Sequence, residues 1–288
     1  MSWRRAPWLL AAGLAASATQ AAWPGPAQPV RFAPERDYGP FVFQREDGRI
    51  DGLSVEMLEL LQRQAGLQVT TLPARPLREQ LEALRRREAD LLSSLRATPE
   101  RGEYALFTLP YVSVPAVVVM REQAPALTLA QLAGAPVAVG EGYAVEAVMR
   151  SRHPRVDWRA VPDDVAALRG LAERRFDAAV LDVASFAFAV RRHTLRGLRV
   201  VAPADFDYAL SFAVRKDWPE LREALDGAIR AMPAAQRQAV LQRWIEQPAV
   251  PARTPWASRV GAALLGLGAL VAVVAGGWRW NVRRRPQA

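Results

Sequence analysis

The chain contains no cysteine, and only two histidines occur among its 288 residues. The absence of cysteine excludes disulfide scaffolds, thiolate zinc sites and cysteine nucleophiles. The histidines, His153 and His193, lie forty residues apart and lack the spacing of a metal site. The sequence also has no G-x-S-x-G nucleophile elbow and no phosphate-binding P-loop. We therefore expect no metal site, no cofactor and no catalytic residue.

Acidic residues are fewer than basic ones, 29 against 38, which gives a net charge of +9. The excess lies at the two ends, because seven arginines and no acidic residue lie outside residues 23–255. The intervening segment is almost neutral and predicts no basic surface for nucleic acid. We therefore expect no nucleic-acid partner, and we assign the terminal arginines to membrane topology.

The first 22 residues have the three parts of a secretory signal. A basic pair, Arg4 and Arg5, precedes a short apolar run over residues 8–16, and small residues follow. An uncleaved anchor or a buried helix is the alternative, but the apolar run is too short to span a bilayer. We expect residues 1–22 to be a signal peptide.

A second apolar segment lies near the other end. Residues 260–278 carry no charge and are just long enough to cross a hydrocarbon core of about 30 Å. Tryptophans flank this segment and an arginine cluster follows it, so the positive-inside rule places the tail in the cytoplasm. We expect a linker at 248–256, a transmembrane helix at 257–279 and a cytoplasmic tail at 280–288. The rest would face the periplasm from a bacterial inner membrane.

Between the ends, short β-like runs alternate with amphipathic helical runs, which is typical of α/β layers with mostly parallel sheets. One helix is expected to begin at Ser54, which can cap it, and to end at Gly66. Asp163 and Asp164 form an acidic pair at the start of a later helix, and we interpret both as caps.

A helix–turn–strand unit is repeated within the chain. Leu81, Leu84, Arg87 and Asp90 recur in type and spacing as Leu168, Leu171, Arg174 and Asp177. The repeat predicts two lobes, and ligands of open α/β sheets bind beyond the carboxyl ends of the strands. Those ends fall at residues 93–96 and at Asp182, which we expect to face each other across a cleft.

Several stretches carry a family resemblance: ERDYGPFVFQREDGRIDGLSVEMLELL, ADLLSSLRATPER, AQLAGAPVAVGEGYAVEAVM and FDAAVLD occur in this order. They resemble the family 3 periplasmic solute-binding proteins, which have the Venus-flytrap fold. The ending LDGAIRAMPAAQRQAVLQRW is similar to the sensor domains of hybrid histidine kinases. The resemblance implies a two-lobed, type II periplasmic-binding-protein-like α/β fold. Residues 30–109 and 206–247 would form one lobe and residues 113–203 the other, with two crossing strands as the hinge.

The resemblance also implies a ligand clamp. Arg101, in a T-P-E-R motif, would bind a ligand carboxylate, which suits its planar two-pronged donor. Asp182 would hold an amino group of the ligand. The alternatives are a surface arginine at a helix start and an aspartate that caps the next helix.

Four further residues match positions near the ligand in this family. Gly142 and Tyr143 stand at a helix start, where backbone N–H groups are free to bind an anion. Tyr38 would wall the pocket, and Tyr208, near the second crossing strand, is a looser candidate. Aromatic residues that only fill the core are the alternative for both tyrosines.

One position departs from the pattern of amino-acid binders. Arg96 stands where those proteins carry a small hydroxyl residue, and a second guanidinium there would repel an ammonium ligand or pair with a second carboxylate. Ser93 and Ser94 supply the missing hydroxyl only if the strand register shifts. A small monocarboxylate or dicarboxylate therefore competes with an amino acid as the expected ligand.

These features predict a membrane-tethered periplasmic binding domain that closes on a small amino acid or carboxylate. Its signal would pass through the membrane or to a partner such as a kinase or cyclase. One alternative is an anchored substrate-binding component of an ABC-type amino-acid importer. A lesser alternative is a dehydratase-like enzyme, because some members of the resembled family are dehydratases.

Overall fold

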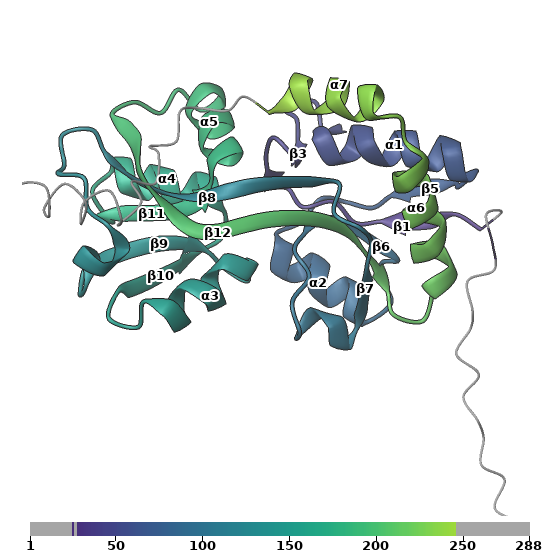
Figure 1. Cartoon of the computed structure of the whole chain (residues 1–288), viewed down its shortest axis with the longest axis horizontal. Helices are drawn as coiled ribbons and strands as arrows, with labels where there is room; N and C mark the ends of the chain where they lie inside the picture. The colour runs from purple at the N-terminus through teal and green to yellow at the C-terminus, as the bar shows by residue number, and fades with distance from the viewer. Residues whose placement is uncertain (1–24, 26–27, 246–288) are drawn as a thin grey trace, which may run out of the picture.

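Two long strands, β8 (Val112–Arg121) and β12 (Leu198–Arg215), run between two α/β lobes and join them (Figure 1). The computed structural model describes residue 25 and residues 28–245. Within these residues no helix is both long enough and apolar enough to cross a membrane. The predicted signal peptide (1–22), linker (248–256), transmembrane helix (257–279) and tail (280–288) all lie outside the described residues.

The first lobe is built from both ends of the described chain. Its strands are β1 (Val30–Phe32), β5 (Val69–Thr71), β6 (Leu91–Leu95) and β7 (Ala105–Phe107). Its helices are α1 (Leu53–Ala65), α2 (Leu77–Arg85), α6 (Pro219–Ala231) and α7 (Ala234–Trp244). A small sheet of β2 (Asp37–Tyr38), β3 (Val42–Gln44) and β4 (Ile50–Asp51) packs against α1.

The second lobe comes from the middle of the chain. Its strands are β9 (Pro136–Gly140), β10 (Asp157–Val161) and β11 (Ala178–Asp182). Its helices are α3 (Ala144–Arg152), α4 (Asp164–Ala172) and α5 (Val183–Arg192). Each lobe also contains a short 3-10 helix, η1 (Arg101–Glu103) in the first lobe and η2 (Leu129–Leu132) in the second.

The main sheet has the order β10-β9-β11-β8-β12-β6-β1-β5, with β7 also paired to β12. The outer strands pair in parallel, as predicted, namely β1 with β5 and β6, and β9 with β10 and β11. The prediction of mostly parallel sheets is wrong for the middle. There β8 and β12 pair antiparallel with each other and with their neighbours, because they cross between the lobes in opposite directions.

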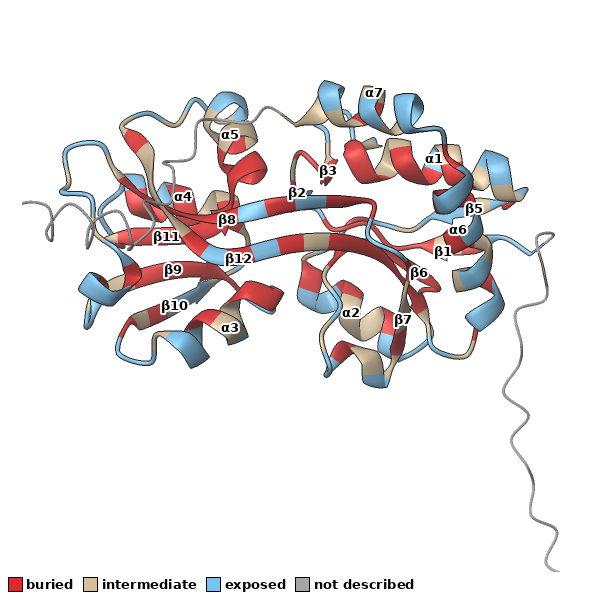
Figure 2. Cartoon of the chain, in the orientation of Figure 1, coloured by how far each residue is buried: buried red, intermediate tan, exposed pale blue. Residues whose placement is uncertain are grey.

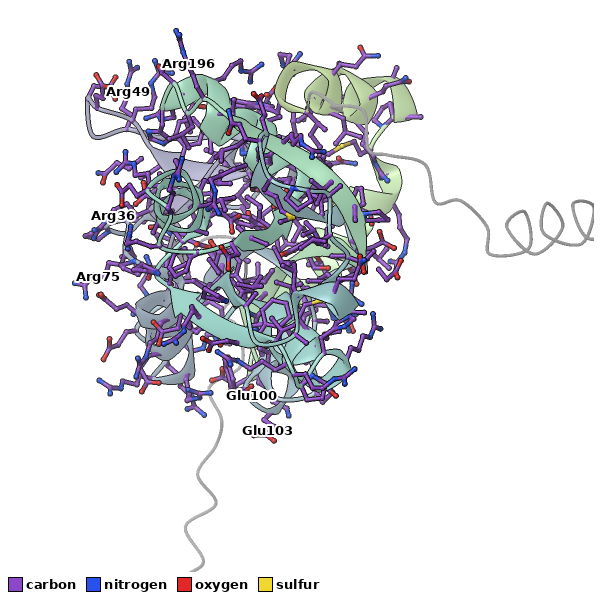
Figure 3. All side chains as sticks on the ribbon, turned by 90° about the vertical axis from the view of Figure 1, so that its left-hand side faces the viewer. Arg36, Arg49, Arg75, Glu100, Glu103 and Arg196 are labelled. Carbon is purple, nitrogen blue, oxygen red and sulfur yellow. The ribbon has the colours of Figure 1, made fainter. Side chains whose placement is uncertain are left out.

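Apolar side chains fill the space between the sheets and the helices, as the distribution of buried residues along the strands shows (Figure 2). Charged side chains are mostly peripheral. Arg49, Glu100 and Glu103, for example, point away from the ribbon (Figure 3). Burial of the apolar faces of helices and strands supplies the main driving force for this arrangement.

The ends of the helices test the capping predictions. Helix α1 ends at Gly66, which has the left-handed conformation with φ of 66°, as predicted. Ser54 is not its cap, because Gly52 holds that position and the Ser54 hydroxyl lies 2.7 Å from the Tyr111 hydroxyl. Asp163 does cap α4, since it accepts the Ala166 N–H at 2.7 Å.

The repeated unit is also visible in the backbone. Arg87 and Arg174, which occupy the same place in the two copies, follow helices α2 and α4 and have φ of 61° and 63°. Few side chains adopt this left-handed conformation. The two copies therefore share a turn as well as a residue pattern.

Candidate ligand-binding site

A narrow cavity, partly open to solvent, lies between the two lobes. Six of the predicted ligand-binding residues line it: Tyr38, Ser94, Arg96, Arg101, Tyr143 and Tyr208. Five further residues complete its wall: Leu95 and Ala144, which lie in segments expected at the cleft, and Glu35, Leu77 and Leu210, which were not predicted. Gly142 and Asp182 are close by but are not part of the wall. The cavity is thus a mixture of apolar, aromatic and charged groups, as is usual for small-molecule sites.

Arg101 begins the 3-10 helix η1, and only 5% of its surface is exposed. Its guanidinium donates to the carbonyl oxygens of Arg96 at 2.8 Å and of Gly142 at 2.7 Å. Gly142 belongs to the second lobe, so this side chain crosses from one lobe to the other. Burial lowers the pKa of Arg101. Because its partners in the described part of the chain are carbonyls, the charge can still be neutralised by an anion.

Glu35 and Tyr143 form a second contact between the lobes. The Tyr143 hydroxyl donates to Glu35 at 2.6 Å, and both side chains are buried. Burial raises the pKa of Glu35 to about 8, against a smaller lowering by the Tyr143 hydrogen bond. The Glu35 carboxyl is therefore mostly protonated at neutral pH.

Sequence reasoning missed Glu35, although a signal for it exists. The residue follows β1, and β1 pairs in parallel with β6. The carboxyl ends of neighbouring parallel strands meet at one edge of a sheet, where ligands bind. The rule that pointed to residues 93–96 after β6 would have found Glu35 after β1.

Tyr38 and Tyr208 both line the cavity, as predicted for a pocket wall. The Tyr38 ring lies edge-on to the Tyr143 ring, with centroids 5.3 Å apart, and the Tyr208 ring lies edge-on to Phe206 at 5.0 Å. Both hydroxyls are buried; the Tyr208 hydroxyl has no hydrogen-bond partner in the described part of the chain, whereas the Tyr38 hydroxyl interacts with the Asp182 carboxyl group and lowers its pKa. Burial raises the pKa of both tyrosines. An unpaired buried hydroxyl is uncommon and favours a polar ligand group nearby.

Asp182 is fully buried and caps helix α5, which is the alternative role that the sequence left open. Its carboxylate accepts the Ser185 N–H at 2.8 Å and the Ser185 hydroxyl at 2.7 Å. Burial raises its pKa to about 6, while the bonds from Ser185 lower it. Tyr38 connects it to the cavity, because its hydroxyl interacts electrostatically with this carboxylate.

Arg96 and Ser94 line the cavity, but other groups already bind their polar ends. The Arg96 guanidinium donates to the Asp207 carbonyl and lies 4.4 Å from the centre of the Phe206 ring. The Ser94 hydroxyl donates to Ser54 at 2.9 Å. The predicted repulsion of an ammonium by Arg96 is thereby weakened, because this guanidinium lies against the crossing strand β12.

The start of helix α3 differs in detail from the expectation. The Gly142 N–H donates to the Glu146 side chain at 2.9 Å, so in this structure that donor is occupied within the second lobe. Ala144 is the first helical residue, it lines the cavity, and the helix has no side-chain cap. The first amides of a helix lack partners within the helix, so this end can receive an anion.

Residues 30–247 match the profile of the bacterial extracellular solute-binding proteins, family 3, and the chain belongs to this family. The family resemblance and the two-lobed fold predicted from the sequence are confirmed.

Individual relatives include both sensor proteins and solute-binding proteins. The virulence sensor protein BvgS of Bordetella pertussis (strain Tohama I) is 28% identical over 279 residues, which are 94% of this chain and 22% of BvgS. The chain thus spans about a fifth of that sensor. The L-cystine-binding protein TcyJ of Escherichia coli (strain K12) is 28% identical over 214 residues, 73% of this chain and 80% of TcyJ.

Solved structures show the same fold. A histidine kinase sensor domain with similarity to periplasmic binding proteins superposes with a TM-score of 0.72 at 24% identity. The match covers 77% of this chain and 98% of that domain. The two-lobed α/β arrangement is therefore shared with a complete sensor domain.

Proposed function

We propose that the chain is a membrane-tethered sensory binding domain whose lobes close on a small amino acid or carboxylate. The main observation behind this proposal is the cavity between the lobes. The buried side chain of Arg101 forms part of its wall. Membership in the solute-binding family supports ligand binding, and the similarity to BvgS supports a sensory role.

Arg101 would bind the carboxylate of the ligand. It already contacts Gly142 in the other lobe, so an anion placed between them would touch both lobes at once. A guanidinium–carboxylate pair is strong where water is excluded, because charge-assisted hydrogen bonds gain from the low local dielectric. A ligand that touches both lobes only in the closed state favours that state.

Helix α7 would carry the closure toward the membrane. It packs on α1, and the Trp244 indole N–H donates to Glu56 of α1 at 2.8 Å. The predicted linker at 248–256 and span at 257–279 follow α7. A movement of the first lobe would therefore be passed to the inner membrane and to a signalling partner such as a kinase or cyclase.

A capture role for an ABC-type importer is the second candidate, and it is supported by the similarity to the ABC transporter arginine-binding protein 1 of Escherichia coli (strain K12), 26% identical over 244 residues. In that case the periplasmic domain would deliver its ligand to a transporter instead of signalling. Co-purification of the chain with importer subunits from bacterial membranes would support this role, whereas co-purification with a kinase or cyclase would support the sensory one.

The direct test is a ligand screen on the full chain in detergent, followed by tryptophan fluorescence on heating. Amino acids and small organic acids are the candidates. A specific ligand at a hundredfold excess over its Kd should stabilise the chain by about 2.7 kcal/mol. We expect Arg101→Ala to abolish this shift, because the ligand carboxylate loses its charged partner. Arg49→Ala, at an exposed position, is the matched control.

Two outcomes would contradict the proposal. If Arg101→Ala responds to the ligand as the unmodified chain does, Arg101 is not the clamp. If the ligand is converted to a product, the dehydratase alternative replaces simple binding.

A further inference from the structure

Asp164 is a buried carboxyl group that the proposed carboxylate clamp does not use. It is the first residue of α4 and is 3% exposed, and neither carboxylate oxygen has a hydrogen-bond partner. The hydroxyl of Ser185 lies nearby on α5, but its single proton is donated to Asp182 at 2.7 Å. The sequence-based interpretation of Asp164 as a helix cap is therefore wrong, since Asp163 alone of the pair provides the cap.

Two buried tyrosine hydroxyls lie within electrostatic range of this carboxyl group. Tyr38 and Tyr208 both interact with Asp164 and Asp182; the Tyr208 hydroxyl has no hydrogen-bond partner in the described part of the chain, and the Tyr38 hydroxyl interacts with Asp182. The tyrosines line the cavity described above, whereas Asp164 lines a second cavity between the lobes. Two carboxyl groups and two hydroxyls thus interact with one another between the lobes.

Carboxyl groups outnumber guanidinium groups among the side chains buried between the lobes. Glu35, Asp164 and Asp182 supply three carboxyl groups, and Arg101 supplies one guanidinium. Arg192 also lines the second cavity, but it is exposed and lies 4.7 Å from the centre of the Phe43 ring. Ionised carboxylates without a cation are costly in a region that excludes water.

The surroundings of Asp164 disfavour its ionised form. Burial raises the pKa of Asp164 well above its ordinary value, and the nearby carboxyl groups of Asp182, Asp163 and Glu35 raise it further. A positively charged group beside Asp164 would favour ionisation instead. The site is therefore poised to exchange a proton for a cationic ligand group.

We propose that Asp164 and Asp182 together bind a positively charged nitrogen of the ligand, and that this ligand carries net positive charge. The inference rests on the proposed function, in which Arg101 holds the ligand carboxylate. A diamino acid has the required groups. Its ammonium groups have three donors each, which match the oxygens of Asp164, Tyr38 and Tyr208. A dicarboxylate would offer no donor to these oxygens and would add charge of the wrong sign.

Isothermal titration calorimetry on the full chain in detergent tests this inference. The probes are L-ornithine, L-lysine and L-arginine as net-positive ligands, L-glutamine as a neutral one and succinate as a dicarboxylate. We expect a net-positive probe to bind at least about tenfold more tightly than the others. Asp164→Asn should weaken its binding by roughly tenfold or more, because the charge is lost. Asp163→Asn is the matched control and should change binding less than about twofold, since asparagine also caps helices.

A second readout separates ligand binding from a structural role. Binding of the net-positive probe should release protons, measured in two buffers of different ionisation enthalpy near about pH 6.5, and Asp164→Asn should release fewer. Without ligand, Asp164→Asn should melt at the same or a higher temperature, because an amide cannot ionise in this buried position.

The outcomes distinguish this inference from the proposed function. If glutamine or succinate binds best and Asp164→Asn leaves its affinity and proton release unchanged, the inference is overturned and the binding function stands. If no probe binds, both are overturned for these ligand classes.

Discussion

The two copies of the repeated helix–turn–strand unit use the same residue types differently. In the first lobe the side chain of Asp90 is 1% exposed and pairs with Arg31 at 2.7 Å and with Arg215 at 3.0 Å. In the second lobe Asp177 is about half exposed and pairs with Arg121 at 3.3 Å. The repeat thus preserves the backbone, while the environment of each copy decides what its carboxylate does.

The strand ends show the same contrast. At the end of β6 the first lobe presents Ser94, whose hydroxyl is bound to Ser54, and beyond it the cation Arg101. At the end of β11 the second lobe presents Asp182, which caps α5 and interacts with Asp164. In the proposed function Arg101 of the first lobe would bind an anionic group, and the carboxyl groups of the second lobe would bind a cationic one. A ligand with both charges would satisfy this asymmetry.

The largest effect that tests this comparison is on stability. Asp90→Ala should lower the free energy of unfolding by about 3 kcal/mol, because it leaves Arg31 and Arg215 without their buried partner. Asp177→Ala, at the same place in the other copy, should cost less than about 1 kcal/mol, since exposed ion pairs contribute little. Urea unfolding of both variants measures the difference. Equal losses of unfolding free energy in the two variants would mean that Asp90 and Asp177 contribute equally to stability.

The contact between Glu35 and Tyr143, which joins the two lobes, should make the stability of the fold depend on pH. The pKa of Glu35 is about 8 in the folded chain, against 4.5 as its ordinary value, so the folded state keeps a proton that the unfolded state has lost. Stability should therefore fall as the pH rises from about 5 to 8, by about 3 kcal/mol. Glu35→Gln should flatten this dependence. Thermal unfolding at several pH values checks it, and an unchanged slope in the variant would assign the effect to other groups.

The smallest effect concerns the shared turn. Arg174 has φ of 63°, which glycine adopts more readily, so Arg174→Gly should stabilise the chain by about 0.5 kcal/mol. Arg87→Gly should gain less, because Arg87 also lies 3.7 Å from Asp217. Urea unfolding compares the two variants. A larger gain at Arg87 would show that its contact with Asp217 does not stabilise the fold.

Much of the fold follows from local patterns. The helix ending at Gly66 and the repeated turns at Arg87 and Arg174 were predictable, because spacing and glycine chemistry are local properties. The antiparallel pairing of β8 and β12 was not, since it depends on how the chain crosses twice between lobes.

The site was predictable only in part. Sequence placed six side chains that do line the cavity, but it could not tell Asp163 from Asp164. Adjacent residues at a helix start look alike, and the rotation of α4 turns one outward as a cap and the other into the interface. Arg96 lines the cavity, but sequence did not predict that its guanidinium lies over the Phe206 ring of the crossing strand.

The central claim is that the lobes close on one ligand through Arg101, and a crystal structure of the full chain with the best-binding probe tests it most directly. The account predicts the ligand carboxylate within about 3 Å of the Arg101 guanidinium, in the cavity that Tyr38 and Tyr143 share. A ligand bound elsewhere, or one whose carboxylate faces away from Arg101, would contradict it.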